Sequence, residues 1–142
     1  MTVQHLNPTS LAAPVRNLYS QVAVAAPGSR LVAIAGQVAV DARGTLVGAG
    51  DLHAQAEQAF RNLRLALEAA GGGPRDLVKY TIHVVDSSPV HVEPVFEAAR
   101  AAFDGELPLV PSTWLGVAAL GLPEWLIEVD GLAAVPGEGN RA

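Results

Sequence analysis

Residues 109–135 read LVPSTWLGVAALGLPEWLIEVDGLAAV and are the stretch on which the fold prediction depends. They contain two extended segments, 110–118 and 125–134, with Leu-Gly-Leu-Pro between them. Two apolar runs separated by a short turn with Gly and Pro are typical of strands joined as a hairpin. We therefore expect these segments to be neighbouring strands at the chemical centre of the protein.

Glu128 is the most informative residue of this stretch. The second segment alternates, so Glu128 and Asp130 point to one face of a strand whose other face is apolar. A carboxylate in such surroundings needs a partner, a cleft or water, because burying a lone charge is very costly. If the two segments are neighbours, the hydroxyl of Ser112 and the indole of Trp114 lie beside Glu128 and complete a candidate site.

The chain of 142 residues is long enough for one domain with a substantial core. We expect a single domain over residues 1–142, in which 1–16 form an N-terminal arm and 136–142 a flexible tail. Half of the residues are hydrophobic, yet only 5% are aromatic. This excess of small apolar side chains indicates surface that other subunits cover.

Charge and residue usage exclude several classes of function. The net charge is −5 and Lys79 is the single lysine, so the basic stripe of a nucleic-acid binder is missing. There is no cysteine, and the four histidines lack a His-x-x-x-His pair, so we expect no metal and no cofactor. Without a signal-peptide pattern or a long apolar run, the sequence predicts a cytoplasmic protein that has no membrane partner.

The remaining elements follow from periodicity and from turn residues. A helix begins after the capping residue Asp51 and ends at the run Gly71-Gly72-Gly73-Pro74. Pro94 is tolerated only in the first turn of a helix, so the second helix begins near residues 92–93. Besides the segments already described, we expect strands at 18–25, 30–40 and 76–85 and helices at 51–70 and 92–103.

Gly36 interrupts the apolar run 30–40. A glycine inside a strand marks either a bulge where something approaches the backbone closely or simple packing against a helix. Both alternatives are open from spacing alone.

The element order is therefore β-β-α-β-α-β-β, which predicts an α+β fold. Two helices of this size can cover only one face of a sheet of five to six strands. The other face must then be covered by a neighbouring subunit, so the element count itself predicts an oligomer.

Several local motifs of the sequence match one known family. They are the Tyr-x-Gln pattern in Tyr19-Ser20-Gln21, the turn around Gly36, the helix 58–72 (QAFRNLRLALEAAGG) and the closing strand 127–130 (IEVD). Together they cover most of the chain and resemble the YjgF/RidA family, the reactive-intermediate (imine or enamine) deaminases, also labelled L-PSP endoribonucleases.

The resemblance implies a chorismate-mutase-like fold with a single mixed sheet, two helices on one face, and a homotrimer with three inter-subunit clefts. It also implies catalytic roles for Glu128, which helps to position the hydrolytic water, and for Tyr19, the cleft tyrosine. Gly36 matches the backbone that contacts a substrate carboxylate.

The chain departs from the family pattern at the expected substrate-binding positions. Ser112 stands where the family has the arginine that binds the substrate carboxylate, Trp114 replaces a residue that is often Cys, and Glu93 replaces an Asn. Losing a guanidinium and gaining a carboxylate makes the pocket less favourable for a carboxylate ligand. Arginines from elsewhere are candidate substitutes, namely Arg30, Arg61 and Arg100.

Each candidate residue also has a structural alternative. Glu128 fits an ion pair at a trimer interface, Tyr19 an interface packing residue, and Trp114 a core residue rather than a stacking platform. Ser112 has no evident His partner, because His83 and His91 lie on other elements, which argues against a serine hydrolase.

The sequence thus predicts a RidA-like trimer that binds a small metabolite and hydrolyses or hydrates an imine, enamine or carbonyl compound. The alternatives are a non-catalytic binding or regulatory trimer, or a C–N hydrolase that performs the family's usual 2-aminoacrylate deamination with a substitute for the arginine. Endoribonuclease activity ranks last, because the acidic chain lacks a basic track.

Overall fold

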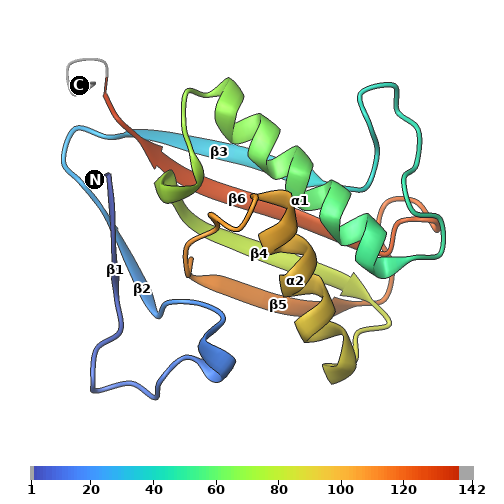
Figure 1. The fold of residues 1–142 in the computed structure, drawn as a ribbon, viewed down its shortest axis with the longest axis horizontal. Coiled ribbons are helices and arrows are strands. Elements are labelled where there is room, and N and C mark those ends of the chain that lie inside the picture. The colour runs from blue at the N-terminus through green and yellow to red at the C-terminus, as the bar shows by residue number, and fades with distance from the viewer. Residues whose placement is uncertain (1, 138–142) are drawn as a thin grey trace.

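The computed structural model describes residues 2–137 and has an α+β architecture, in which two helices pack on one face of a four-stranded mixed sheet (Figure 1). The strands lie in the order β3-β6-β4-β5, with β4 and β5 parallel and the other pairs antiparallel. The elements of this layer pair are β3 (Arg30–Gln37), α1 (Leu52–Ala69), β4 (Leu77–Val85), α2 (Val92–Ala102), β5 (Ser112–Val117) and β6 (Ile127–Val135).

The predicted hairpin between 110–118 and 125–134 is wrong. Strand β4 lies between β5 and β6 and forms ladders with both of them. The reason is that β5 follows α2, which crosses over the sheet and returns the chain parallel to β4 on its outer side. The segment after β5 then leads to the other edge of β4. Two strands that follow each other in the sequence are therefore not neighbours in the sheet.

The N-terminal residues form a second, two-stranded antiparallel sheet. Strand β1 (Val3–Leu6) pairs with β2 (Val22–Ala25), and Val3 is buried. The six strands thus divide into two sheets rather than forming the expected single one. Residues 1–16, expected as an N-terminal arm, contain β1, whose four residues are too few to show a periodicity in the sequence. Of the predicted tail, residues 138–142 lie outside the described residues.

Helix α1 begins and ends as its sequence predicts. The side chain of Asp51 accepts a hydrogen bond from the amide of Ala54, and the helix gives way to the glycine run after Ala70. Its apolar stripe is fully buried against the sheet, where the Phe60 ring meets Tyr80 edge-on at a centroid distance of 5.5 Å. Aromatic pairs prefer this arrangement, which adds to the stabilisation from burial.

Polar side chains of α1 also hold two loops in place. The Asn62 side-chain amide donates to the carbonyl oxygens of Val38 and Val40, at 2.9 and 2.8 Å. Gln55 is completely buried and accepts a hydrogen bond at 2.9 Å from the amide of Leu126, just before β6. These hydrogen-bonded amides, of which Asn62 is half-buried, specify the loop conformation, because an alternative conformation would leave polar groups unpaired.

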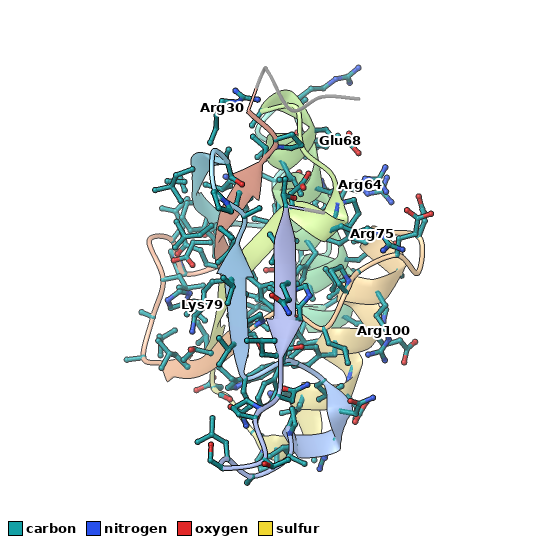
Figure 2. All side chains as sticks on the ribbon, turned by 90° about the vertical axis from the view of Figure 1, so that its left-hand side faces the viewer. Arg30, Arg64, Glu68, Arg75, Lys79 and Arg100 are labelled. Atoms are coloured by element: carbon teal, nitrogen blue, oxygen red, sulfur yellow. The ribbon has the colours of Figure 1, made fainter. Side chains whose placement is uncertain are left out.

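The two faces of the sheet differ in character. The face beneath the helices carries buried residues at alternate positions, such as Ile82, Val84 and Val129. Figure 2 shows Lys79 on the opposite side of the sheet from the helices, whereas Arg64 and Arg100 lie on the helix side. In the described chain no helix packs on that opposite side, which we call the open face.

Candidate ligand-binding site

A cavity of about 490 Å³ lies at β5, on the edge of the sheet. Residues from three parts of the chain form its walls: the N-terminal turn at 15–19, the start of α2, and β5 itself. Its volume is within the range of small-molecule sites, and most of its lining is apolar. Among the predicted site residues, those that line it are Tyr19, Ser112 and Trp114.

Trp114 forms a flat apolar wall of this cavity. Its ring stacks on Phe96 of α2 with a centroid distance of 6.3 Å and an interplanar angle of 22°. The indole Nε1 donates a 2.7 Å hydrogen bond to the Ser87 hydroxyl, which fixes the ring orientation. Trp114 is therefore in part a core residue and in part a wall of the cavity, since its side chain packs on the core and also lines the cavity.

Ser112 has a structural partner as well as a position in the cavity wall. It lies opposite Tyr80 in the β4–β5 ladder, on the helix side of the sheet. Burial raises the pKa of the Tyr80 hydroxyl well above its usual value, and the hydrogen bond with Ser112 and the charge of Arg100 oppose that rise. His83 points to the open face, where its Nδ1 lies 3.1 Å from the Glu128 carbonyl oxygen. It therefore does not pair with Ser112.

The N-terminal turn places a charged residue, Arg16, at the cavity, and the sequence did not predict this position. Arg16 lines the cavity, and its Nη1 lies 3.8 Å from Oε1 of Glu93 at the start of α2. Arg16 and Asn17 both have positive φ angles, 54° and 53°, and the Tyr19 hydroxyl accepts a hydrogen bond from the Val15 amide across this turn. Only the folded turn places Arg16 here, and a sequence pattern does not encode such backbone geometry.

Glu128 and Gly36 form a second group, on the open face. A β-bulge between Ile34 and Gln37 shifts the β3–β6 register. A Cβ atom at Gly36 would overlap the carboxylate of Glu128, so the absence of a side chain leaves room for this carboxylate. The close-approach alternative for Gly36 is therefore confirmed, and the group that approaches is Glu128 rather than a helix.

The two groups do not meet within one chain. Ser112 and Trp114 were expected beside Glu128, but β4 separates their strands and their side chains lie on opposite faces of the sheet. Glu93, which was expected in the substrate site, pairs with Arg16 and thereby lies on the cavity side. The expected juxtaposition of Ser112, Trp114 and Glu128 is wrong for a single chain.

A larger cavity of about 590 Å³ contains none of the predicted site residues. His5 and Arg75 are among its lining residues, and burial lowers the pKa of His5. Within residues 2–137 no three potential metal ligands cluster. Nor does the described part of the chain contain a helix long and apolar enough to cross a membrane.

The geometry thus defines an α+β domain with a small-molecule pocket at one edge of its sheet. The family model described as Endoribonuclease L-PSP matches residues 10–135, and the chain belongs to this family. It is 31% identical over 140 residues to the RutC family protein slr0709 of Synechocystis sp. (strain ATCC 27184 / PCC 6803 / Kazusa), with 96% of this chain and 99% of the relative covered.

Solved structures agree with this assignment. The Rid family protein YyfB from Yersinia pestis, described as of unknown function, is similar with a TM-score of 0.86 and 36% identity, over 95% of this chain and 100% of that chain. A putative endoribonuclease from Thermotoga maritima gives a TM-score of 0.64 and 26% identity, over 94% and 99%. The resemblance to the YjgF/RidA family is therefore confirmed.

Proposed function

We propose that the chain assembles into a homotrimer whose clefts, each between two copies, bind a small metabolite. In each cleft one copy contributes the cavity with Tyr19, Ser112 and Trp114, and another contributes Glu128 and Gly36. The observation that carries this proposal is the separation of the two groups on opposite faces of the sheet. A second copy would reunite them, because the cavity opens at an edge strand and Glu128 lies on an uncovered face.

The composition of the open face supports self-association. Leu31 is 77% exposed, and Leu115 and Leu132 are 44% and 40% exposed. Register places them on the same face as Lys79 and Glu128. Large apolar side chains interspersed with a few charges are typical of subunit interfaces, and covering them would remove apolar area from water.

In such a cleft Glu128 would serve as the acid/base for hydrolysis of an imine, for which the enamine is a tautomer. The carboxylate accepts a proton from water as the water oxygen bonds to the C=N carbon. It then returns the proton to nitrogen, which gives a carbinolamine. In a second transfer the carboxylate moves the proton of the new hydroxyl to nitrogen as the C–N bond breaks, and a carbonyl compound and ammonia or an amine leave. Tyr19 and Ser112 offer hydroxyls to hold the ligand, and Trp114 offers a flat surface.

Two alternatives remain in view. In the first, the cleft only binds a ligand and regulates another process, because the resemblance places Ser112 at the position of the family's arginine. The family's usual deamination is the other, and Arg16 gives it a specific basis, because this guanidinium lines the same cavity. RNA cleavage is the least favoured function, since the net charge is −5.

The proposal is tested with 2-aminoacrylate and a panel of other imines and carbonyl compounds, with product formation and molar mass measured on the purified protein. We expect a trimer whose turnover falls at least 100-fold in Glu128→Gln and is unchanged in Glu97→Gln, a control on the exposed side of α2. A Ser112→Arg variant measures whether 2-aminoacrylate turnover increases. Unchanged turnover in Glu128→Gln would exclude the acid/base role, and a wild type without any turnover would favour the binding trimer.

A further inference from the structure

We propose that the Arg16–Glu93 pair selects a zwitterionic ligand, with a carboxylate and an ammonium on an apolar and preferably aromatic body. This inference rests on the proposed function of the cleft and names a ligand that binds there rather than the imine that is hydrolysed, because an ammonium group has no C=N bond. This ligand differs from a simple carboxylate, for which a lone guanidinium would suffice. Four features of the cavity support it.

The first feature is the position of Arg16. Among the lining residues of this cavity that the structure describes, Arg16 alone carries a formal charge. It is held there by a turn in which two successive non-glycine residues, Arg16 and Asn17, adopt positive φ angles. Such conformations are unfavourable for L-residues and persist where surrounding contacts impose them. Here the Asn17 amide donates a hydrogen bond to the Pro14 carbonyl oxygen and the Leu18 amide donates one to the Val15 carbonyl oxygen, so that both bonds span the turn.

The second feature is the unused bonding capacity of the pair. The 3.8 Å separation of Arg16 Nη1 and Glu93 Oε1 is longer than a direct hydrogen bond, and the two side chains are 49% and 53% exposed. A guanidinium has five N–H donors and a carboxylate two acceptor oxygens. Both partners can therefore bind a ligand without first losing a strong mutual contact.

The third feature is the charge balance around Arg16, whose partner Glu93 lies beside the residues that line the cavity and is not one of them. Glu93 lies in the first turn of α2, where the helix dipole favours a negative charge. A ligand carboxylate that approaches Arg16 therefore meets the field of Glu93 as well. An ammonium group on the same ligand removes this repulsion by pairing with Glu93. Opposite charges on one small molecule match the pair better than either charge alone.

The fourth feature is the apolar remainder of the site. Trp114, stacked on Phe96, forms one wall, and Leu18 and Val92 contribute further apolar surface. A planar ligand body gains both burial and stacking there. The charged head of the ligand would lie at Arg16 and its apolar body against Trp114.

The test compares three probes that share a phenyl ring: phenylalanine carries both charges, 3-phenylpropanoate only the carboxylate, and phenethylamine only the ammonium. Binding is followed by calorimetry and by Trp114 fluorescence in a Trp125→Phe background, since the chain has two tryptophans. We expect phenylalanine to bind at least tenfold more tightly than either single-charge probe. Arg16→Gln should weaken phenylalanine binding at least tenfold. Glu93→Gln should strengthen 3-phenylpropanoate binding and so reduce the preference for phenylalanine.

Arg43→Gln, in an exposed loop, and Glu97→Gln, on the outer side of α2, serve as matched controls and should keep the wild-type preference. Equal affinities for phenylalanine and 3-phenylpropanoate, an unchanged preference in Glu93→Gln, or no binding of any probe would overturn the zwitterion proposal. None of these outcomes depends on turnover. The two proposals fail separately, because the zwitterion preference is read from equilibrium binding to the wild type and the Arg16 and Glu93 variants, whereas the acid/base role is read from turnover in Glu128→Gln.

Discussion

The two faces of the four-stranded sheet arise from the same alternation of side chains along the strands, but the helices cover only one of them. On the helix side, alternate strand residues such as Ile82 and Val129 join Phe60 of α1 in the core and are completely buried. On the open face, Lys79, Thr81 and Glu128 stand among leucines that one chain leaves exposed. The large buried cluster of the chain therefore lies between the sheet and the helices.

The same difference between the faces explains why the predicted site residues do not meet within one chain. Pocket residues such as Trp114 belong to the helix side and edge of the sheet, whereas Glu128 belongs to the open face. Each group is well ordered by its own neighbours, namely Phe96 and Ser87 for Trp114 and the bulge at Gly36 for Glu128. A single chain therefore supplies two half-sites, and the proposed assembly joins them.

Truncation of a core side chain beneath the helices should give the largest loss of stability. Phe60→Ala removes a completely buried ring that contacts Tyr80. It should lower the free energy of unfolding by about 3–5 kcal/mol in a urea titration, because a cavity remains. The matched change Leu31→Ala on the open face should leave an isolated chain nearly unchanged and weaken self-association instead. Equal losses of stability in dilute protein would contradict the distinction between the faces.

Gln55 should have the next largest effect. Gln55→Leu keeps the volume but leaves the Leu126 amide and the carbonyls of Gly48 and Glu124 without their partner. Unfolding free energy should fall by about 2–3 kcal/mol, since buried groups lose their hydrogen bonds. Gln58→Leu, which removes one half-buried contact to Asn62, is the control and should cost less. If both variants unfold alike, Gln55 does not organise the loop before β6.

Gly36→Ala tests whether the glycine leaves room for the Glu128 side chain on the open face. The added methyl group would overlap the Glu128 carboxylate and force this side chain to another rotamer. Stability should fall by about 1 kcal/mol, the lower end of the cost of overpacking, and any turnover that depends on Glu128 should fall with it. Gly73→Ala is the control, because its Cβ would meet no atom within 4 Å. A crystal structure in which Glu128 does not move would contradict this account of Gly36.

The smallest effect concerns pH. Burial lowers the pKa of His5 in the folded protein below 6.5, and hydrogen bonding to the Leu77 backbone opposes this only in part. Below pH 6.5 the unfolded chain therefore binds more protons than the folded one, and stability decreases as the pH falls. His5→Phe should flatten the stability profile between pH 6.5 and 5 in thermal unfolding. An unchanged slope would assign the acid sensitivity to other groups.

Much of the fold could be predicted because it rests on local patterns. The cap at Asp51, the stripe of α1 and the first-turn position of Pro94 in α2 all follow from short-range rules and are confirmed. The alternation around Glu128 also holds, since Ile127 and Val129 are buried and Glu128 is not. Long-range pairing did not follow from these rules. Insertion of β4 between β5 and β6 depends on where α2 returns the chain, which no local pattern specifies.

The site was predicted only in part for the same reason. Tyr19, Ser112 and Trp114 do line one cavity, as the family motifs imply. Arg16 was missed because its position depends on two left-handed residues, and Gln55 because a buried amide has the same sequence signal as an exposed one. The roles of Glu128 and Gly36 in a cleft remain predictions, because they involve another copy of the chain.

The most direct test of the shared site uses chemical crosslinking between copies. The natural chain has no cysteine, so single Glu128→Cys and Ser112→Cys variants each carry one thiol. They are given different tags, co-assembled and treated with a short bis-maleimide. We expect a covalent product that contains both tags. In the control, Glu68→Cys on the outer side of α1 replaces Glu128→Cys and should give little product. No mixed product above this control, with light scattering that shows a monomer, would contradict the account of two half-sites joined by assembly.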